Sequence, residues 1–214
     1  MRTSLTDPLQ IAEIPIAEGF GKVGLTLCPG KKQSGAATGS WSRDLRLDLD
    51  SIARWNAAAL VTLVEEAELT RLGVPDLGSA VQDDHLLWYH LPIQDAGIPD
   101  RQFETAWAIV GEHLRAMLRD GFNVLVHCKG GLGRAGTCAS RLLIELGMAP
   151  ADAVRAVRQV RRGAIETTAQ LDYVMDLAPV PEAQPHGSVA AIRDRALGAM
   201  IGLAVGDAIG TTLE

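Results

Sequence analysis

Short apolar runs alternate with amphipathic segments along most of the chain. Residues 59–64 (ALVTLV), 86–91 (LLWYHL) and 122–127 (FNVLVH) are continuous apolar runs of the kind found in buried strands. Between these runs, apolar residues recur at helical spacing. Strands that alternate with helices predict an α/β domain with a mainly parallel central sheet flanked by helices.

The spacing of apolar residues also predicts the individual helices. They are expected at 43–58, 68–72, 100–119, 134–146 and 150–162, with a last one beginning over 171–177. Asp100 is expected to cap the helix that precedes Gly121. Residues 13–27 predict an edge strand or hairpin, and the polar, glycine-rich stretch 31–42 (KKQSGAATGSWS) predicts a loop.

A proline-rich stretch, APVPEAQPHGS, ends this pattern and predicts a linker. We therefore divide the chain into a main domain at 1–178, a linker at 179–191 and a separate helix at 192–214. In that last segment a glycine recurs every four residues from Gly198 to Gly210, in an apolar background. Such a face of small residues suits close packing against another helix.

Composition and charge narrow the possible functions. The chain has 214 residues, of which 47% are hydrophobic, so it can bury a full core. A net charge of −6 argues against a general nucleic-acid binder. The three cysteines, Cys28, Cys128 and Cys138, form a poor disulfide framework and suit a reducing compartment. The sequence has no run with the pattern of a signal peptide or of a membrane span, so we expect a cytoplasmic protein without membrane contact.

The segment VLVHCKGGLGRAGT carries the clearest chemistry. Cys128 follows a predicted strand, glycines follow it, and Arg134 opens the next helix. Glycines let backbone N–H groups converge on an anion, the helix N-terminus adds positive charge, and a guanidinium binds two phosphoryl oxygens. The same field favours a thiolate, so Cys128 is the expected nucleophile and Arg134 the phosphate clamp. The expected phosphate-binding residues are Lys129, Gly130, Gly131, Leu132, Gly133 and Arg134.

Other interpretations of this segment stay open at this point. His127 is expected to support the loop by orienting it, although a buried core histidine would fit the same position. Cys128 itself would suit a buried core thiol if it stood alone. A rhodanese-type sulfurtransferase also uses a cysteine loop beside a helix.

His127-Cys128-x-x-Gly131-x-x-Arg134 resembles the signature of the protein-tyrosine and dual-specificity phosphatases. The segments GLTLCPGKK, GVPDL, WYHLPIQDAGIPD and GAIETTAQLDYV extend the likeness over about residues 20–178, to the cyclin-dependent-kinase-associated phosphatase family. The resemblance implies a phosphatase domain that needs no metal or cofactor. It also implies a phosphorylated protein or peptide as substrate, hydrolysed at phosphotyrosine, phosphoserine or phosphothreonine through a phosphocysteine intermediate.

The resemblance also implies roles for residues outside the loop. Asp95, in HLPIQDAGIPD, matches the family's general acid, whereas the competing Asp100 is better explained as a helix cap. Gln170 matches the glutamine that positions the hydrolytic water; the alternative is a solvated helix residue. Glu166 stands where relatives often carry another glutamine.

One departure from the family pattern concerns turnover. Relatives usually have serine or threonine after the arginine, where this chain has Ala135. Losing that hydroxyl predicts slower breakdown of the phosphoenzyme, and Thr137 is the residue that can compensate. Impaired turnover makes a phosphate-recognising module one alternative function. Because the sequence does not disclose the substrate, a phosphatase of a small non-protein phosphoester is another.

The end of the chain, RALGAMIGLAVGDAIGTTLE, resembles the first helix of ADP-ribosylglycohydrolases. The likeness implies fusion or contact with such a domain. The family's acidic metal-binding cluster has no counterpart in this chain, so we predict neither a metal site nor glycohydrolase activity.

Overall fold

The computed structural model describes residues 1–36 and 39–181. At its centre is a five-stranded sheet with the order β1-β2-β7-β5-β6. The strands β2, β7, β5 and β6 are parallel, and β1 pairs antiparallel with β2 at one edge. The predicted mainly parallel sheet and the predicted edge hairpin are therefore confirmed. The strands are β1 (Ala12–Ile14), β2 (Val23–Leu27), β5 (Ala57–Thr62), β6 (Leu87–His90) and β7 (Asn123–Cys128).

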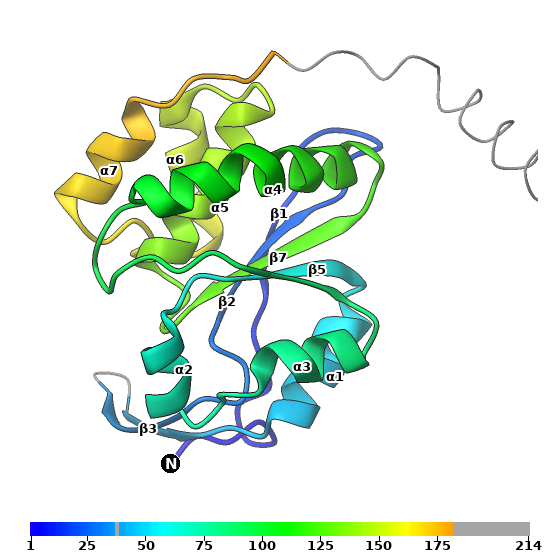
Figure 1. Ribbon diagram of the computed structural model, residues 1–214, viewed down its shortest axis with the longest axis vertical. Coiled ribbons are helices and arrows are strands. Elements are labelled where there is room, and N and C mark those ends of the chain that lie inside the picture. Colours follow the sequence, from blue (N-terminus) through cyan, green and yellow to red (C-terminus); the bar gives the residue numbers. More distant parts are fainter. Residues whose placement is uncertain (37–38, 182–214) are drawn as a thin grey trace, which may run out of the picture. The chain divides into compact units, whose positions relative to one another are not determined.

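Helices cover both faces of this sheet (Figure 1): α4 to α7 lie on one side, and α1 to α3 on the other. The central strands β5 and β7 are buried on both faces, which explains why they appear in the sequence as continuous apolar runs. The helices are α1 (Leu45–Arg54), α2 (Glu66–Arg71), α3 (Leu77–Asp83), α4 (Arg101–Arg119), α5 (Gly133–Glu145), α6 (Pro150–Val160) and α7 (Thr168–Met175).

The predicted loop at 31–42 is wrong. Strands β3 (Lys32–Ala36) and β4 (Gly39–Ser42) form a separate antiparallel pair there. They lack an apolar pattern because Trp41 is the buried residue of the pair. Three cations lie over its ring, at 5.1 Å for Arg2, 4.8 Å for Lys31 and 5.7 Å for Arg43. These cation–π contacts take the place of an apolar strand face.

The helix α3 has no counterpart among the predicted elements. Gly78 lies in its first turn, where the sequence suggests a break. A Cβ at Gly78 would lie 2.5 Å from the Trp88 ring. The absence of a side chain there lets α3 pack directly on β6.

The longest helix, α4, begins as predicted. The Asp100 carboxylate accepts a hydrogen bond from the Phe103 amide at 2.8 Å and so caps the helix. Two turns further on, α4 is joined to α5 through Glu145, which accepts from the Trp107 indole of α4 at 2.9 Å and from Arg141 of α5 itself at 2.7 Å. This buried network fixes the helix that carries the predicted phosphate clamp.

The division of the chain beyond the main domain is not tested by this fold. The predicted linker runs past residue 181, and the predicted helix at 192–214 lies wholly outside the described residues. Within residues 1–36 and 39–181, every helix is too short or too polar to cross a bilayer.

Candidate active site

The loop between β7 and α5 lies at the carboxyl edge of the parallel strands, where open α/β sheets usually bind ligands. Cys128 is the last residue of β7 and is buried. Gly131 has a φ of +71°, and a Cβ there would lie 2.5 Å from the Thr26 carbonyl group. Only glycine meets both conditions, so the loop can turn closely against β2.

Two cations outside the loop hold its carbonyl groups. The Lys31 ammonium donates to the Lys129 carbonyl at 3.2 Å. The Arg161 guanidinium donates to the carbonyls of Gly130 and Gly131, both at 3.1 Å. In a trans peptide the N–H group that follows a carbonyl points in the opposite direction. The amides that follow these three carbonyls therefore point away from the two cations. Successive amides that point the same way suit an anion-binding nest.

The Arg134 side chain is buried and held on one side by Glu68. Its two terminal nitrogens bond the Glu68 carboxylate at 2.5 and 3.1 Å, and one of them also donates to the Ile93 carbonyl at 2.9 Å. Glu68 accepts in addition from the Glu65 amide at the start of α2. The guanidinium therefore has one orientation, fixed by a helix from a different part of the chain.

Asp95 lies at the mouth of the same site. Its carboxylate is 3.0 Å from the Arg134 guanidinium and 3.4 Å from the Lys129 ammonium, and the side chain is 56% exposed. Asp100, the competing candidate, caps α4 and does not line this cavity. Of the two carboxylates, the structure brings Asp95 to the loop.

The resulting cavity has a volume of about 200 Å³ and joins the predicted nucleophile, clamp and acid. Among the other predicted phosphate-binding residues, Lys129 and Gly130 line it, whereas Leu132 lines a neighbouring cavity. The Gly133 amide is already bonded to the Glu166 carboxylate, at 2.8 Å. The cavity is lined by Lys31, Gln33, Ala36, Asp95, Ala96, Cys128, Lys129, Gly130, Arg134 and Glu166.

Gln170 connects two loops behind this cavity. Its side chain is fully buried, donates to the Gly97 carbonyl at 3.0 Å and accepts from the Glu166 amide at 2.9 Å. The alternative of a solvated helix residue is therefore wrong. Gln170 ties the segment that contains Asp95 to the start of α7.

His127 is buried within the sheet, behind the loop. Its Nε2 lies 2.8 Å from the Thr62 hydroxyl, which also accepts from the Trp88 indole at 2.8 Å. Its Nδ1 has no hydrogen-bond partner among the described residues. Burial lowers the pKa of His127 to about 3, so the ring is neutral at physiological pH.

On the other side of the loop, the Thr137 hydroxyl donates to the Gly133 carbonyl at 3.0 Å.

The other two thiols, Cys28 and Cys138, do not line the cavity that contains Cys128. Burial raises the pKa of Cys28, and raises that of Cys138 to about 12, so both stay protonated at neutral pH. All three cysteines are free. Within the part of the chain that the structure describes, no cluster of His, Cys, Asp and Glu is able to hold a metal ion.

The sequence alone did not indicate Lys31, Glu68 or Arg161. Lys31 and Arg161 bond loop carbonyls that lie 98 and about 30 positions away in the chain. Glu68 has the sequence context of an ordinary capping-box glutamate on a short helix. No local motif marks such residues, because their role depends on how the elements pack.

The parallel sheet and its cysteine–arginine loop define a phosphatase fold of the dual-specificity type. Residues 37–174 match the family described as "Swiss Army Knife protein, DSP-PTPase phosphatase domain", and the chain belongs to this family. This membership contradicts the sulfurtransferase alternative.

Relatives and solved structures agree with the assignment. Mouse cyclin-dependent kinase inhibitor 3 is 30% identical over 171 residues, which cover 78% of this chain and 77% of the relative. Mouse protein tyrosine phosphatase type IVA 2 is 39% identical over 90 residues, covering 41% and 52%. The structure of kinase associated phosphatase with its catalytic-site cysteine replaced by serine aligns with a TM-score of 0.68 and 27% identity, covering 78% of this chain and 92% of that one. Tk-PTP in its active form aligns with a TM-score of 0.54 and 29% identity, covering 76% and 93%.

Proposed function

We propose that this domain hydrolyses phosphotyrosine, phosphoserine or phosphothreonine in proteins through a phosphocysteine intermediate. The observation that supports the proposal is the convergence of Cys128, Arg134 and Asp95 on one cavity of the size of a phosphoryl group and its first neighbours. Free cysteines and the phosphoprotein substrates of the family suit a protein of the cytoplasm.

In the first step the Cys128 thiolate attacks phosphorus, and a sulfur–phosphorus bond forms as the bond to the leaving oxygen breaks. Arg134 and the loop amides bind the equatorial oxygens. Asp95, as the general acid, gives its proton to the departing alkoxide or phenoxide.

In the second step water attacks the phosphocysteine. The Asp95 carboxylate takes a proton from this water, the sulfur–phosphorus bond breaks, and inorganic phosphate leaves the regenerated thiolate. Gln170 supports this step by holding the Asp95 segment through Gly97.

The decisive experiment measures hydrolysis of an aryl phosphate in the presence of EDTA. Wild-type protein should be active, and Cys128→Ser should abolish the activity; undiminished hydrolysis by that variant would refute the proposal. Asp95→Ala should lower kcat by about 10²- to 10⁴-fold and accumulate phosphoenzyme. Asp100→Ala is the matched control, which should lower stability by about 1 kcal/mol without trapping phosphoenzyme.

A second candidate is a phosphate-recognising module with impaired turnover. It is supported by Ala135, which is buried, and by Thr137, whose hydroxyl is already bonded to the Gly133 carbonyl. Rapid-mixing kinetics with a phosphopeptide separate the two: tight binding with no burst of product release favours the module. If the missing hydroxyl is the cause, Ala135→Ser should raise the steady-state rate about tenfold.

The third candidate is a phosphatase of a small non-protein phosphoester. A panel of phosphotyrosine peptides, phosphothreonine peptides and phosphoinositides distinguishes it from a protein phosphatase. A kcat/KM for phosphoinositides far above that for both peptides would favour this candidate.

A further inference from the structure

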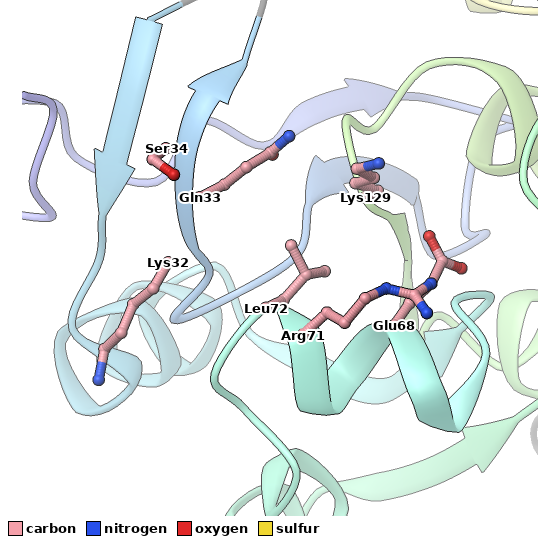
Figure 2. Close-up of a pocket in the computed structure, with 7 residues that line it drawn as sticks. All are labelled: Lys32, Gln33, Ser34, Glu68, Arg71, Leu72 and Lys129. Atoms are coloured by element: carbon pink, nitrogen blue, oxygen red, sulfur yellow. The ribbon is translucent and has the colours of Figure 1, made fainter.

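A second cavity adjoins the candidate active site. It has a volume of about 290 Å³ and shares Gln33 and Lys129 with the cavity that contains Cys128. Figure 2 shows Arg71 and Glu68 reaching it from α2, and Gln33 pointing from β3 toward Lys129. Residues from three separate elements therefore meet beside the predicted phosphate site.

The charge of this second cavity is positive. Its cations are Lys32, Arg71 and Lys129, and its one acidic side chain is Glu68. Both Glu68 carboxylate oxygens are bonded by Arg134, which neutralises that charge. Lys129 has a weak contact with Asp95 at 3.4 Å.

Arg71 is the cation best placed to bind an anion there. It lies in the last turn of α2, is exposed, and forms no ion pair with any residue in the described ranges. The ammonium of Lys32 points away from Arg71 and Lys129 in Figure 2, so it adds to the local potential without converging with them. A guanidinium with unused donors matches the two oxygens of a carboxylate or phosphate.

We propose that this cavity binds a second anionic group of the substrate, an acidic or phosphorylated residue next to the phosphoresidue that is hydrolysed. The inference rests on the proposed function, since it assumes that the first cavity holds the scissile phosphate. Because Lys129 borders both cavities, an anion in the second lies about one side chain away from the phosphoryl group in the first. The domain is thereby selective for phosphopeptides with an acidic neighbour.

Peptides that differ by one charge test this selectivity. A phosphotyrosine peptide with alanine at the three flanking positions on each side is compared with peptides that carry a single aspartate at each position in turn. For wild-type protein, kcat/KM should rise about fivefold for at least one aspartate position. The ratio of kcat/KM for that aspartate peptide to kcat/KM for the alanine peptide should fall toward one in high salt.

The ratio of the two kcat/KM values should follow the charge at residue 71. Arg71→Gln should bring the ratio close to one, and Arg71→Glu should bring it below one. Arg155→Glu is the matched control: Arg155 is exposed on α6, on the other face of the sheet (Figure 1), and should leave the ratio unchanged. A structural defect would lower both kcat/KM values without this graded change in their ratio.

The outcomes separate the selectivity from the proposed activity. A wild-type ratio of one at every position, or a ratio unaffected by Arg71→Glu, overturns the selectivity while the phosphatase activity stands. If wild-type protein hydrolyses no peptide and no aryl phosphate, the proposed function fails. In that case the Kd values of the same neutral and acidic peptides are measured with Cys128→Ser. Equal Kd values for the two kinds of peptide overturn the selectivity as well.

Discussion

His127 lies inside the sheet directly before Cys128, and its burial links protonation to folding. The pKa is lowered from 6.5 to about 3, so between these values the unfolded chain binds more protons than the folded one. The free energy of unfolding therefore falls as the pH falls through this window. We expect the titration of His127 to lower the free energy of unfolding by about 2 kcal/mol between pH 7 and pH 5, measured by urea unfolding at both values.

The variant His127→Gln should remove that part of the pH dependence, because glutamine keeps a polar partner for Thr62 and does not titrate. His113→Gln, a change at an exposed position of α4, should retain the wild-type dependence. Equal losses of stability in the wild type and in His127→Gln would contradict this role for the buried ring.

Arg161 contacts the proposed phosphate-binding loop from outside it, through the carbonyls of Gly130 and Gly131. Arg161→Gln removes the charged donors to these carbonyls, whose following amides we propose to bind the phosphate. We expect the inhibition constant of inorganic phosphate to rise about tenfold, which corresponds to one lost hydrogen bond to a charged group. Arg162→Gln, a change at the exposed neighbouring position, is the control and should leave phosphate inhibition as it is.

The residues of the site were predictable to different degrees, for a physical reason. Cys128 and Arg134 stand at the two ends of one short loop, so the chemistry proposed for them imposes a spacing that is visible in the sequence. Asp95 lies on a separate segment and was identified by resemblance. Arg161 and Glu68 hold the loop and the clamp in place, and only the packing of α6 and α2 brings them there.

At the scale of elements, the short helix α2 is joined to the site by the pair of Glu68 and Arg134. Both side chains are buried, so removing the carboxylate leaves a buried guanidinium without its main partner. We expect Glu68→Ala to lower the free energy of unfolding by about 3 kcal/mol and to reduce aryl phosphatase activity, measured by urea unfolding and steady-state kinetics.

The exposed Glu66 of the same helix provides the comparison for that variant. Glu66→Ala should change the unfolding free energy by no more than about 0.5 kcal/mol and leave activity intact. If Glu68→Ala behaves like Glu66→Ala, the pair does not anchor the clamp.

The elements themselves were predicted best where burial is complete. The central strands β5 and β7 have neighbours on both faces, so their apolar runs were recognisable in the sequence. The pair β3 and β4 is stabilised by cations over one tryptophan, and α3 packs on β6 through a glycine. Both kinds of packing use residues that usually indicate loops, and the sequence pattern therefore missed these elements.

At the scale of the molecule, the carboxyl edge of the parallel strands gathers the site. The loop that starts with Cys128 follows β7, the turn into α2 follows β5, and the segment of Asp95 follows β6. Each strand end thus supplies a different part of the proposed mechanism: the nucleophile, the support of the clamp, and the acid. All of these residues lie in the compact unit Met1–Val180, and the family match ends at residue 174.

A chain ending at residue 181 should therefore retain the phosphatase activity of the full chain. We expect kcat/KM for an aryl phosphate to stay within about twofold and the thermal midpoint to be unchanged, because no buried side chain of the described core is removed. A chain ending at 167 is the contrasting variant: it loses the buried Gln170 and Val174, and the Tyr173 hydroxyl that donates to Glu104 at 2.8 Å. That shorter chain should unfold at a lower temperature and lose activity. A tenfold loss in the chain ending at 181 would instead mean that residues 182–214 contribute to catalysis.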